Sequence, residues 1–398
     1  MNVSRLCPLV LLGPLLLAAC GRAPTAESAL PAASHPTPIS AQGVTITTFK
    51  HPGIAISQAN LDGLRAAVAS GQAPTLQGWQ KVTSSRFASP THTARPFATI
   101  TTQEGGPYAS DTPYGSGDLE LREDSLAAFL NALQWRVTGK SEYAQAAIRI
   151  MNSWAGTLQE IKGHNTKLLA AHAAVRWANA AELIRGSGAG WRGTDQDRFA
   201  LMLRREFYEP IKTFQGDYYG NWDAAMINAL MAMGVYLNDN AMFNLGWDRY
   251  LGTEGRGALR NYIHPTTYEV AETCRDQAHA QMGLGYLAGA AEVAYNQGYP
   301  HLYTAYNHLL LRGYEFEARY ILGKGNVPLQ GCTNGPQDRA AVTGGTVQLY
   351  PVWEIAYNHY HHRSGFNTTY TSQLALKVRP EGDIHMLLGF GTALYARP

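Results

Sequence analysis

The sequence predicts a mainly α-helical domain in which helical hairpins pack into a ring or bent solenoid, an α/α toroid with a few short strands and long loops. Amphipathic segments follow one another in quick succession from residue 119 to residue 322. Short turns that contain Gly or Asn separate them, such as Arg185-Gly186-Ser187-Gly188. We find no strict sequence repeat, and β-like runs only at residues 44–49 and 345–350. This pattern favours stacked helix pairs.

Length and composition limit the possible classes of protein. The 398 residues can hold one large domain or two ordinary ones, and we expect a single domain over residues 44–398. A content of 45% hydrophobic and 16% charged residues is typical of a soluble globular protein. A net charge of +2 without a Lys/Arg tract gives no sign of nucleic-acid binding, so local positive groups would have to bind any acidic substrate. Without CxxC or HExxH spacing, we expect no metal and no cofactor.

The first 43 residues look like an export signal and a tether. Residues 1–20 have a positive start at Arg5 and an apolar run too short to span a membrane. They end in Leu17-Ala18-Ala19-Cys20, which resembles the bacterial lipoprotein box and predicts lipidation at Cys20. An ordinary signal peptide or a short anchor are the alternatives. Residues 21–43 are rich in Ala, Pro and Ser and predict a disordered tether. We therefore expect a lipid-anchored protein of the cell envelope, or a secreted one.

The folded part is expected to be helical from residue 54. Ser57 or Asn60 can cap the first helix. Residues 84–118 lack periodicity, and so long a connection is often functional and can form a wall of a cleft. Further helices are predicted at Leu119–Thr138, Ser141–Ser153, Lys167–Arg185, Thr194–Phe207, Trp222–Leu237, Asn240–Tyr250, Asp276–Gln297 and His301–Leu322. The tail from Gly323 is mixed, with a helical stretch at Val352–Tyr360.

The most informative stretch begins at Glu272 and leads into the apolar run Leu284–Ala294. Read as one helix, it places on a single stripe two carboxylates, a guanidinium, an imidazole, a glycine and a phenol, namely Glu272, Asp276, Arg275, His279, Gly283 and Tyr286. Such a stripe is a candidate active site. The alternative is a buried structural network in which Arg275 bridges the two carboxylates, and spacing alone leaves both open.

This stretch resembles the signature of the alginate-lyase-like polysaccharide lyases. The similar residues are Glu-Thr-Cys-Arg-Asp-Gln-Ala-His-Ala-Gln-Met-Gly-Leu-Gly from Glu272, together with Gly220-Asn221-Trp222-Asp223 and Tyr357-Asn358-His359-Tyr360. The resemblance runs from about His51 to Arg363. It implies the α/α toroid fold and β-elimination on a uronic-acid polymer, alginate or glucuronan-like, without selecting one polymer.

A lyase of this kind removes the proton at C5 of a uronate and expels the oxygen at C4, which requires neutralisation of the adjacent carboxylate. The resemblance implies that Asn221 helps to neutralise it, although Asn221 can also be a plain N-cap. Relatives with a longer motif carry a His directly after this Asn, where this chain has Trp222. We therefore expect His279 to be the base, ahead of His264 on a loop, and Arg275 to bind the carboxylate or hold a phenolate.

Other residues are expected to line the cleft. Tyr360 is the candidate for a catalytic tyrosine, and the expected substrate-binding residues are Trp222, Gln277, Tyr286, Tyr357, Asn358 and His359. Packing and capping are the alternative roles for the aromatic turn at residues 357–360, and Tyr286 is equally consistent with the core.

The cysteines suggest one disulfide. Cys7 lies in the leader and Cys20 in the lipoprotein box, which leaves Cys274 and Cys332 in the folded part. Two remaining thiols in an exported protein are candidates for a bond, and two unpaired buried thiols are the alternative.

Two rival functions remain open at this point. A glycoside hydrolase on the same ring would use Asp223 with Asp276 or Glu272 as acid and base. A non-catalytic surface lipoprotein would bind polysaccharide through aromatic rings. On the lyase reading we expect a monomer whose partner is an acidic polysaccharide, with no nucleic acid and with a membrane only through the lipid at Cys20.

Overall fold

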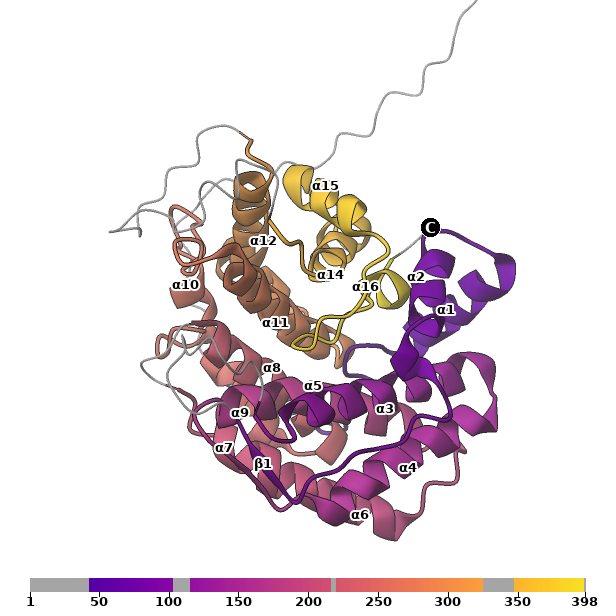
Figure 1. Ribbon diagram of the computed structural model, residues 1–398. Coiled ribbons are helices and arrows are strands. Elements are labelled where there is room, and N and C mark those ends of the chain that lie inside the picture. The colour runs from indigo at the N-terminus through magenta and orange to yellow at the C-terminus, as the bar shows by residue number, and fades with distance from the viewer. Residues whose placement is uncertain (1–42, 103–114, 216–219, 325–346, 397–398) are drawn as a thin grey trace, which may run out of the picture.

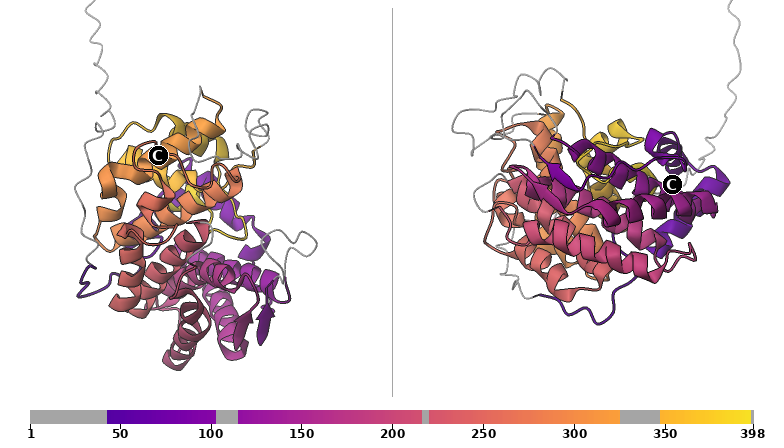
Figure 2. Two further views of the ribbon diagram at one scale, coloured as in Figure 1. Left: turned by 90° about the vertical axis from the view of Figure 1, so that its left-hand side faces the viewer. Right: turned by 60° about the horizontal axis from the view of Figure 1, so that its bottom comes forward.

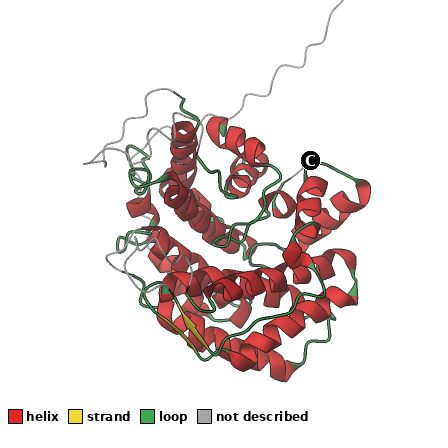
Figure 3. Cartoon of the chain, viewed as in Figure 1, coloured by secondary structure: helices red, strands yellow, loops and turns green. Residues whose placement is uncertain are grey.

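The computed structural model describes residues 43–102, 115–215, 220–324 and 347–396, and helices dominate this part of the chain (Figure 1, Figure 3). Four long helices form the interior: α3 (Asp118–Thr138), α5 (Thr166–Ile184), α8 (Gly220–Leu237) and α11 (Gln277–Asn296). Each packs against the next in chain order. The predicted α/α toroid of helical hairpins is confirmed.

An outer helical segment follows each inner helix and packs back on it. The outer segments are α4 (Ser141–Thr157), α6 (Gly193–Met202) with the π-helical turn η2 (Leu203–Tyr208), α9 (Asn240–Leu251) and α12 (His301–Ile321). The inner helices α5 and α8 are buried on nearly all sides and are rich in Ala, as expected for helices surrounded by protein. Figure 2 shows that the C-terminal helices (orange to yellow) gather on one side of the domain and the middle ones on the other.

The two ends of the described chain meet and complete the ring. Helix α16 (Gly391–Leu394) packs against α1 (Gln58–Ser70) and α2 (Thr75–Thr83), and the Thr75 hydroxyl donates to the Ala396 carbonyl at 3.2 Å (Figure 1). The remaining elements are η1 (Arg86–Ala88), α7 (Glu209–Ile211), α10 (Leu259–Tyr262), α14 (Trp353–Tyr357), the π-helical turn η3 (Asn358–Arg363), α15 (Thr369–Val378) and the parallel strands β1 (Thr99–Thr101) and β2 (Glu160–Lys162).

The helices predicted from residue 119 to residue 322 are all present, with small shifts at their ends. Ser57, one of the two expected caps, caps α1: its side chain accepts from the backbone N–H of Asn60. Helix α12 is interrupted, because Ala305 to His308 leave helical geometry. The possible strand at residues 345–350 is absent from its described part, residues 347–350.

The strand predicted at residues 44–49 is also wrong, and side chains explain why the segment is nevertheless extended. The Asn244 amide pairs with both backbone groups of Val44, at 2.8 Å each. One turn earlier on α9, the Asn240 amide does the same for Ile46, at 3.1 and 2.6 Å. Residues four apart on a helix match the spacing of alternate residues in an extended chain. Helix α9 thus replaces a neighbouring strand.

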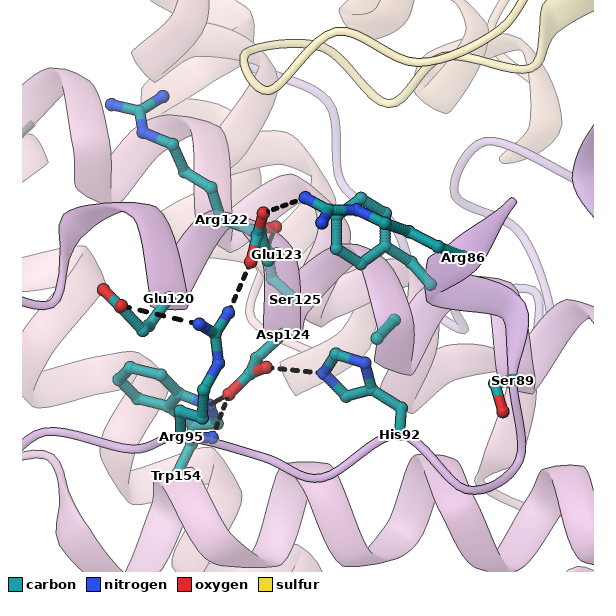
Figure 4. A network of polar contacts seen from close by, with 12 residues as sticks. Arg86, Ser89, His92, Arg95, Glu120, Arg122, Glu123, Asp124, Ser125 and Trp154 are labelled. Atoms are coloured by element: carbon teal, nitrogen blue, oxygen red, sulfur yellow. Dashed lines mark hydrogen bonds and ion pairs between the residues drawn. The ribbon is translucent and has the colours of Figure 1, made fainter. Parts of the chain in front are cut away.

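Residues 86–98, the start of the long connection predicted as a cleft wall, are fixed to α3 by a polar network (Figure 4). The fully buried Asp124 accepts from His92 at 2.7 Å, from the Arg95 amide at 2.6 Å and from Trp154 at 2.8 Å. Its neighbour Glu123 pairs with the guanidinium groups of Arg86 and Arg95. This stretch is therefore a structural strap, and residues 103–114 lie outside the described residues.

The membrane-related predictions concern a part of the chain that the structure does not describe. The leader, the lipidation site Cys20 and residues 21–42 of the tether all lie outside the described residues. Among the helices that are described, none combines the length and apolarity needed to cross a bilayer.

Candidate active site

The candidate site lies where α8 and α11 begin. Asn221 is in the first turn of α8, and its backbone N–H lies 3.5 Å from Oε1 of Glu272, in the turn before α11. The two inner helices pack side by side along their lengths. Two motifs about 50 residues apart in the sequence are therefore brought together.

The stretch from Glu272 to Tyr286 is not a single helix, which corrects the prediction. Asp276 has an extended backbone conformation and caps α11, because its Oδ1 accepts from the His279 amide at 2.8 Å. Residues 272–275 form a turn in which the Arg275 amide donates to the Glu272 carbonyl at 2.9 Å. The turn still gathers the predicted side chains: the Arg275 guanidinium lies 3.8 Å from Glu272 and 3.5 Å from Asp276.

Glu272 is the buried centre of the site, with a side chain that is 2% exposed. Its carboxylate contacts the backbone N–H of Asn221 and the guanidinium of Arg275 on one side. On the other side it accepts from the Tyr262 hydroxyl at 3.2 Å. Burial raises the pKa of Glu272 to about 7, although the charges of His279 and Arg275 act in the opposite direction. The carboxyl therefore titrates near neutrality and links the two helices.

Tyr262 was not among the residues predicted for the site from the sequence. Its position depends on two glycines of the motifs, Gly220 and Gly283, which leave room for its ring. A Cβ at Gly283 would lie 2.0 Å from the Tyr262 hydroxyl, and one at Gly220 would lie 2.5 Å from its ring. The fully buried ring thus fills a slot that both motif glycines leave open. From this slot the hydroxyl reaches Glu272 and the carbonyl oxygens of His279 (3.1 Å) and Ala280 (3.3 Å).

His279 and Asp276 form a dyad with a defined proton arrangement. The Nδ1 atom of His279 lies 2.7 Å from Oδ1 and 2.6 Å from Oδ2 of Asp276. An ionised carboxylate only accepts, so Nδ1 carries the proton and Nε2 of the neutral ring has a lone pair. Burial would raise the pKa of Asp276, but the hydrogen bonds and charge of His279 and Arg275 lower it below its usual value. The His279 side chain is 28% exposed and thus accessible.

The side chains of the Gly220-Asn221-Trp222-Asp223 motif are buried. Asp223 accepts from the Gln215 amide at 3.2 Å and pairs with Arg249 at 3.0 Å, so the carboxylate proposed for a hydrolase is committed to fixing loops. Trp222 is buried edge-on against His164, with ring centroids 6.2 Å apart, and offers no open face to a sugar. The Asn221 amide oxygen is buried without a hydrogen-bond partner among the described residues, which is unusual for a structural residue.

The four residues of the predicted sugar subsite, residues 357–360, form a buried cluster, as the alternative of packing and capping expects. Tyr357, Asn358, His359 and Tyr360 are all buried. The Tyr360 hydroxyl donates to the Tyr303 carbonyl at 2.9 Å. The His359 ring stacks on Tyr303, and burial lowers the pKa of His359 to about 3. Nearby, Arg363 pairs with Glu292, which follows His279 by 13 residues on α11. That separation is about 20 Å along the axis, so Tyr360 is not the cleft tyrosine.

Tyr286, Gln277 and His264 also lie outside the central group. Tyr286 is buried and its hydroxyl contacts His172 at 2.8 Å; both residues line a partly open pocket. Gln277 is buried and donates to the Thr273 carbonyl at 3.1 Å. His264 is exposed on its loop and accepts from the amides of Thr266 (3.3 Å) and Thr267 (3.1 Å). Of the two candidate bases, only His279 is connected to Asn221 and Arg275 through the network around Glu272.

Cys274 lies next to Arg275 in the turn and is disulfide-bonded. Its predicted partner, Cys332, lies outside the described residues. Within the described part of the chain, no group of three or more His, Cys, Asp or Glu side chains is arranged to hold a metal ion.

Comparisons with known proteins identify the family and the fold. The alginate lyase family model matches residues 102–327. No curated protein matches the sequence. Among solved structures, alginate lyase A1-III from Sphingomonas species A1 has a TM-score of 0.66 and 15% identity, over 88% of this chain and 98% of that one. An alginate lyase from Bacteroides ovatus has a TM-score of 0.60 and 14% identity, over 87% and 99%.

A His-to-Ala variant of A1-III, complexed with a tetrasaccharide, has a TM-score of 0.64 and 15% identity, over 88% of this chain and 98% of that one. At such low identity these structures establish the fold. The family model covers more than half of the chain and establishes the family. The protein therefore belongs to the alginate lyase family and is a polysaccharide lyase.

Proposed function

We propose that the protein cleaves a uronic-acid polymer, alginate or a glucuronan-like chain, by β-elimination. One observation carries the proposal: Asn221, Arg275 and His279 meet at the start of α8 and α11, joined through Glu272 and Asp276. The tetrasaccharide complex of the related A1-III variant supports an oligosaccharide ligand for this fold.

The first requirement of the reaction is neutralisation of the uronate carboxylate, which makes the C5 proton acidic. Asn221 supplies an amide and Arg275 a guanidinium with several donors. Asn221 lies in the first turn of α8, and Arg275 lies just before α11. The positive ends of two helix dipoles therefore add to the attraction for an anion at this point.

The second requirement is a base for the C5 proton. His279 is suited to it because Asp276 holds the proton on Nδ1 and leaves the Nε2 lone pair for the substrate. As Nε2 takes the proton, the negative charge of Asp276 stabilises the resulting imidazolium. The electron pair of the C5–H bond forms the C4=C5 double bond. The C4–O bond breaks with its electron pair on the departing O4, which takes a proton from water.

The reaction class is tested by incubating the protein with polymannuronate, polyguluronate, glucuronan and a neutral glycan. We expect ultraviolet-absorbing unsaturated ends from at least one uronate polymer and none from the neutral glycan. New reducing ends without ultraviolet absorbance would indicate hydrolysis, and no product would indicate a binding protein.

The residue roles are tested by single substitutions. We expect His279→Ala to lose about a hundredfold or more in turnover. Asn221→Ala should fold normally and lose about 3 kcal/mol of transition-state stabilisation. The matched control is His264→Ala, which removes an exposed histidine outside the network and should keep near-wild-type turnover. Wild-type turnover in both His279→Ala and Asn221→Ala would overturn the assignment.

A further inference from the structure

The turn that carries Arg275 is held from behind by a residue of the outer helix α12. Thr273, two residues before Arg275, is 1% exposed, and its hydroxyl donates to Oε2 of Glu317 at 2.6 Å. Glu317 is fully buried and lies in the part of α12 that keeps helical geometry, and α12 packs against α11. This hydrogen bond therefore connects the outer layer of the ring to the candidate site.

Thr273 is placed so that its position affects the whole turn. Its backbone N–H donates to the Val270 carbonyl at 3.0 Å, and its carbonyl accepts from the Gln277 side chain at 3.1 Å. It directly follows Glu272, whose carboxylate lies 3.8 Å from the Arg275 guanidinium. A displacement of Thr273 thus moves the turn on both sides and changes the position of Arg275.

Glu317 has no other polar partner in the described part of the chain. Its Oε1 atom is buried without a hydrogen bond, and no Lys, Arg or His side chain of the described residues forms an ion pair with it. Burial of a carboxyl without a counter-ion costs free energy, and an unsatisfied buried oxygen is rare in native proteins. The hydrogen bond from Thr273 is the one interaction that accounts for a carboxyl at this position.

The carboxyl of Glu317 is uncharged at neutral pH. Burial is the main cause that raises its pKa to about 8; the hydrogen bond from Thr273 lowers the pKa, and the charges of Glu269 and Asp276 raise it. Glu269 follows α10 in the chain, Asp276 caps α11, and Tyr262 of α10 is the third titratable group that interacts with Glu317. All three are acids, so none of them stabilises an ionised Glu317.

We propose that Glu317 is a positioning residue: through Thr273 it fixes the turn that presents Arg275 to the uronate carboxylate. The inference rests on the proposed function, in which Arg275 neutralises that carboxylate. An ionised Glu317 would add a buried negative charge beside the turn and oppose the binding of an anionic substrate. Glu317 therefore acts in its uncharged form, and kcat/KM falls as the pH rises through its pKa.

The first test removes the hydrogen bond from either side. We expect Thr273→Val and Glu317→Leu each to lower kcat/KM on the uronate polymer at pH 7 by about tenfold, a loss typical of one buried hydrogen bond. Thr273→Ser keeps the hydroxyl and Glu317→Gln keeps the acceptor, so both should stay close to the wild-type value. Rescue by these conservative variants distinguishes the hydrogen bond from the mere filling of space.

A matched control lies on the same helix. Glu315 accepts from the backbone N–H groups of Tyr370 and Thr371 at the start of α15, at 3.1 and 2.8 Å. Glu315→Leu should therefore lower stability, because it removes the cap of α15, and keep the wild-type kcat/KM. A loss of kcat/KM in Glu315→Leu as large as in Glu317→Leu would show a general effect of α12 and overturn the proposal.

The second test is the pH profile of Glu317→Gln, which a merely structural role would not change. Gln accepts the same hydrogen bond but does not ionise. Relative to this variant, we expect the wild type to lose about tenfold in kcat/KM between pH 7 and pH 9, because a carboxyl with a pKa of about 8 is mostly ionised at pH 9. Parallel profiles of the two enzymes would overturn the role of the uncharged carboxyl.

The outcomes separate this inference from the proposed function. Wild-type kcat/KM in Thr273→Val, measured beside an active wild type, would overturn the positioning role and leave the proposed function intact. Equal losses in Thr273→Val and Thr273→Ser would do the same. Thr273→Val and the pH profile of Glu317→Gln decide the question even where Glu317→Leu does not fold. A wild type that gives no unsaturated product from any uronate would overturn the proposed function and this inference with it.

Discussion

Replacement of Gly283 by Ala tests whether the slot for Tyr262 supports the site. The added Cβ would lie 2.0 Å from the Tyr262 hydroxyl and 2.1 Å from the ring carbon that carries it. The ring is fully buried, so it can move only by displacing its neighbours. Any displacement breaks its hydrogen bond to Glu272, whose carboxylate also contacts the Asn221 amide and Arg275. The substitution therefore acts on stability and on the site together.

The size of the effect follows from three contributions. Overpacking of a rigid core costs up to about 3 kcal/mol. Loss of the hydrogen bond to buried Glu272 costs at least about 1 kcal/mol. The better helix propensity of Ala returns about 1 kcal/mol. We expect Gly283→Ala to lower the free energy of unfolding by about 3 kcal/mol and kcat/KM by at least about tenfold, which corresponds to about 1.4 kcal/mol.

The assay is urea denaturation of the wild type, Gly283→Ala and Gly63→Ala, with turnover measured on the same preparations. Gly63 lies in α1, and a Cβ there would meet nothing within 4 Å. This matched control should gain up to about 1 kcal/mol and keep full activity. The reasoning is refuted if Gly283→Ala is as stable and as active as the control.

Three further predictions follow from other parts of the structure. Tyr360→Phe should lose about 1 kcal/mol of stability, because its hydroxyl bonds a backbone carbonyl, and should keep wild-type turnover; a selective loss of activity would contradict its structural role. The hydrogen bond to Glu182 raises the pKa of His51 above 6.5. Protonated His51 therefore contributes its whole stabilisation of the fold below pH 6.5, and this contribution disappears as the pH rises through the raised pKa. The difference in unfolding free energy between wild type and His51→Ala should thus be larger at pH 6 than at pH 9, and equal differences would exclude this. Peptide mapping without reduction should join Cys274 to Cys332, and finding both as free thiols would disprove that pairing.

The helical framework was predictable because its signals are local. Apart from Asn228, residues 224–237 of helix α8 are all apolar or small, a pattern that only a helix enclosed by others can bury. Caps such as Ser57 are readable from residue type and position. The segment at residues 44–49 was misread because alternation of side chains indicates an extended chain but not what it pairs with. Here it pairs with two asparagines about 200 residues away.

The candidate site was only partly predictable. Spacing of three or four residues between Glu272, Arg275, Asp276 and His279 looks alike in a helix and in a turn followed by a capped helix. The residues converge in either case, so the grouping was right and the helix boundary was wrong. For residues 357–360, subsite and packing both stayed open because residue types do not reveal burial.

The central claim is tested most directly by a crystal structure of His279→Ala with a uronate tetrasaccharide bound. We predict that one carboxylate of the sugar lies within about 3.5 Å of both the Asn221 side-chain amide and the Arg275 guanidinium. A tetrasaccharide bound elsewhere on the toroid, or one whose carboxylates all point into solvent, would contradict the account.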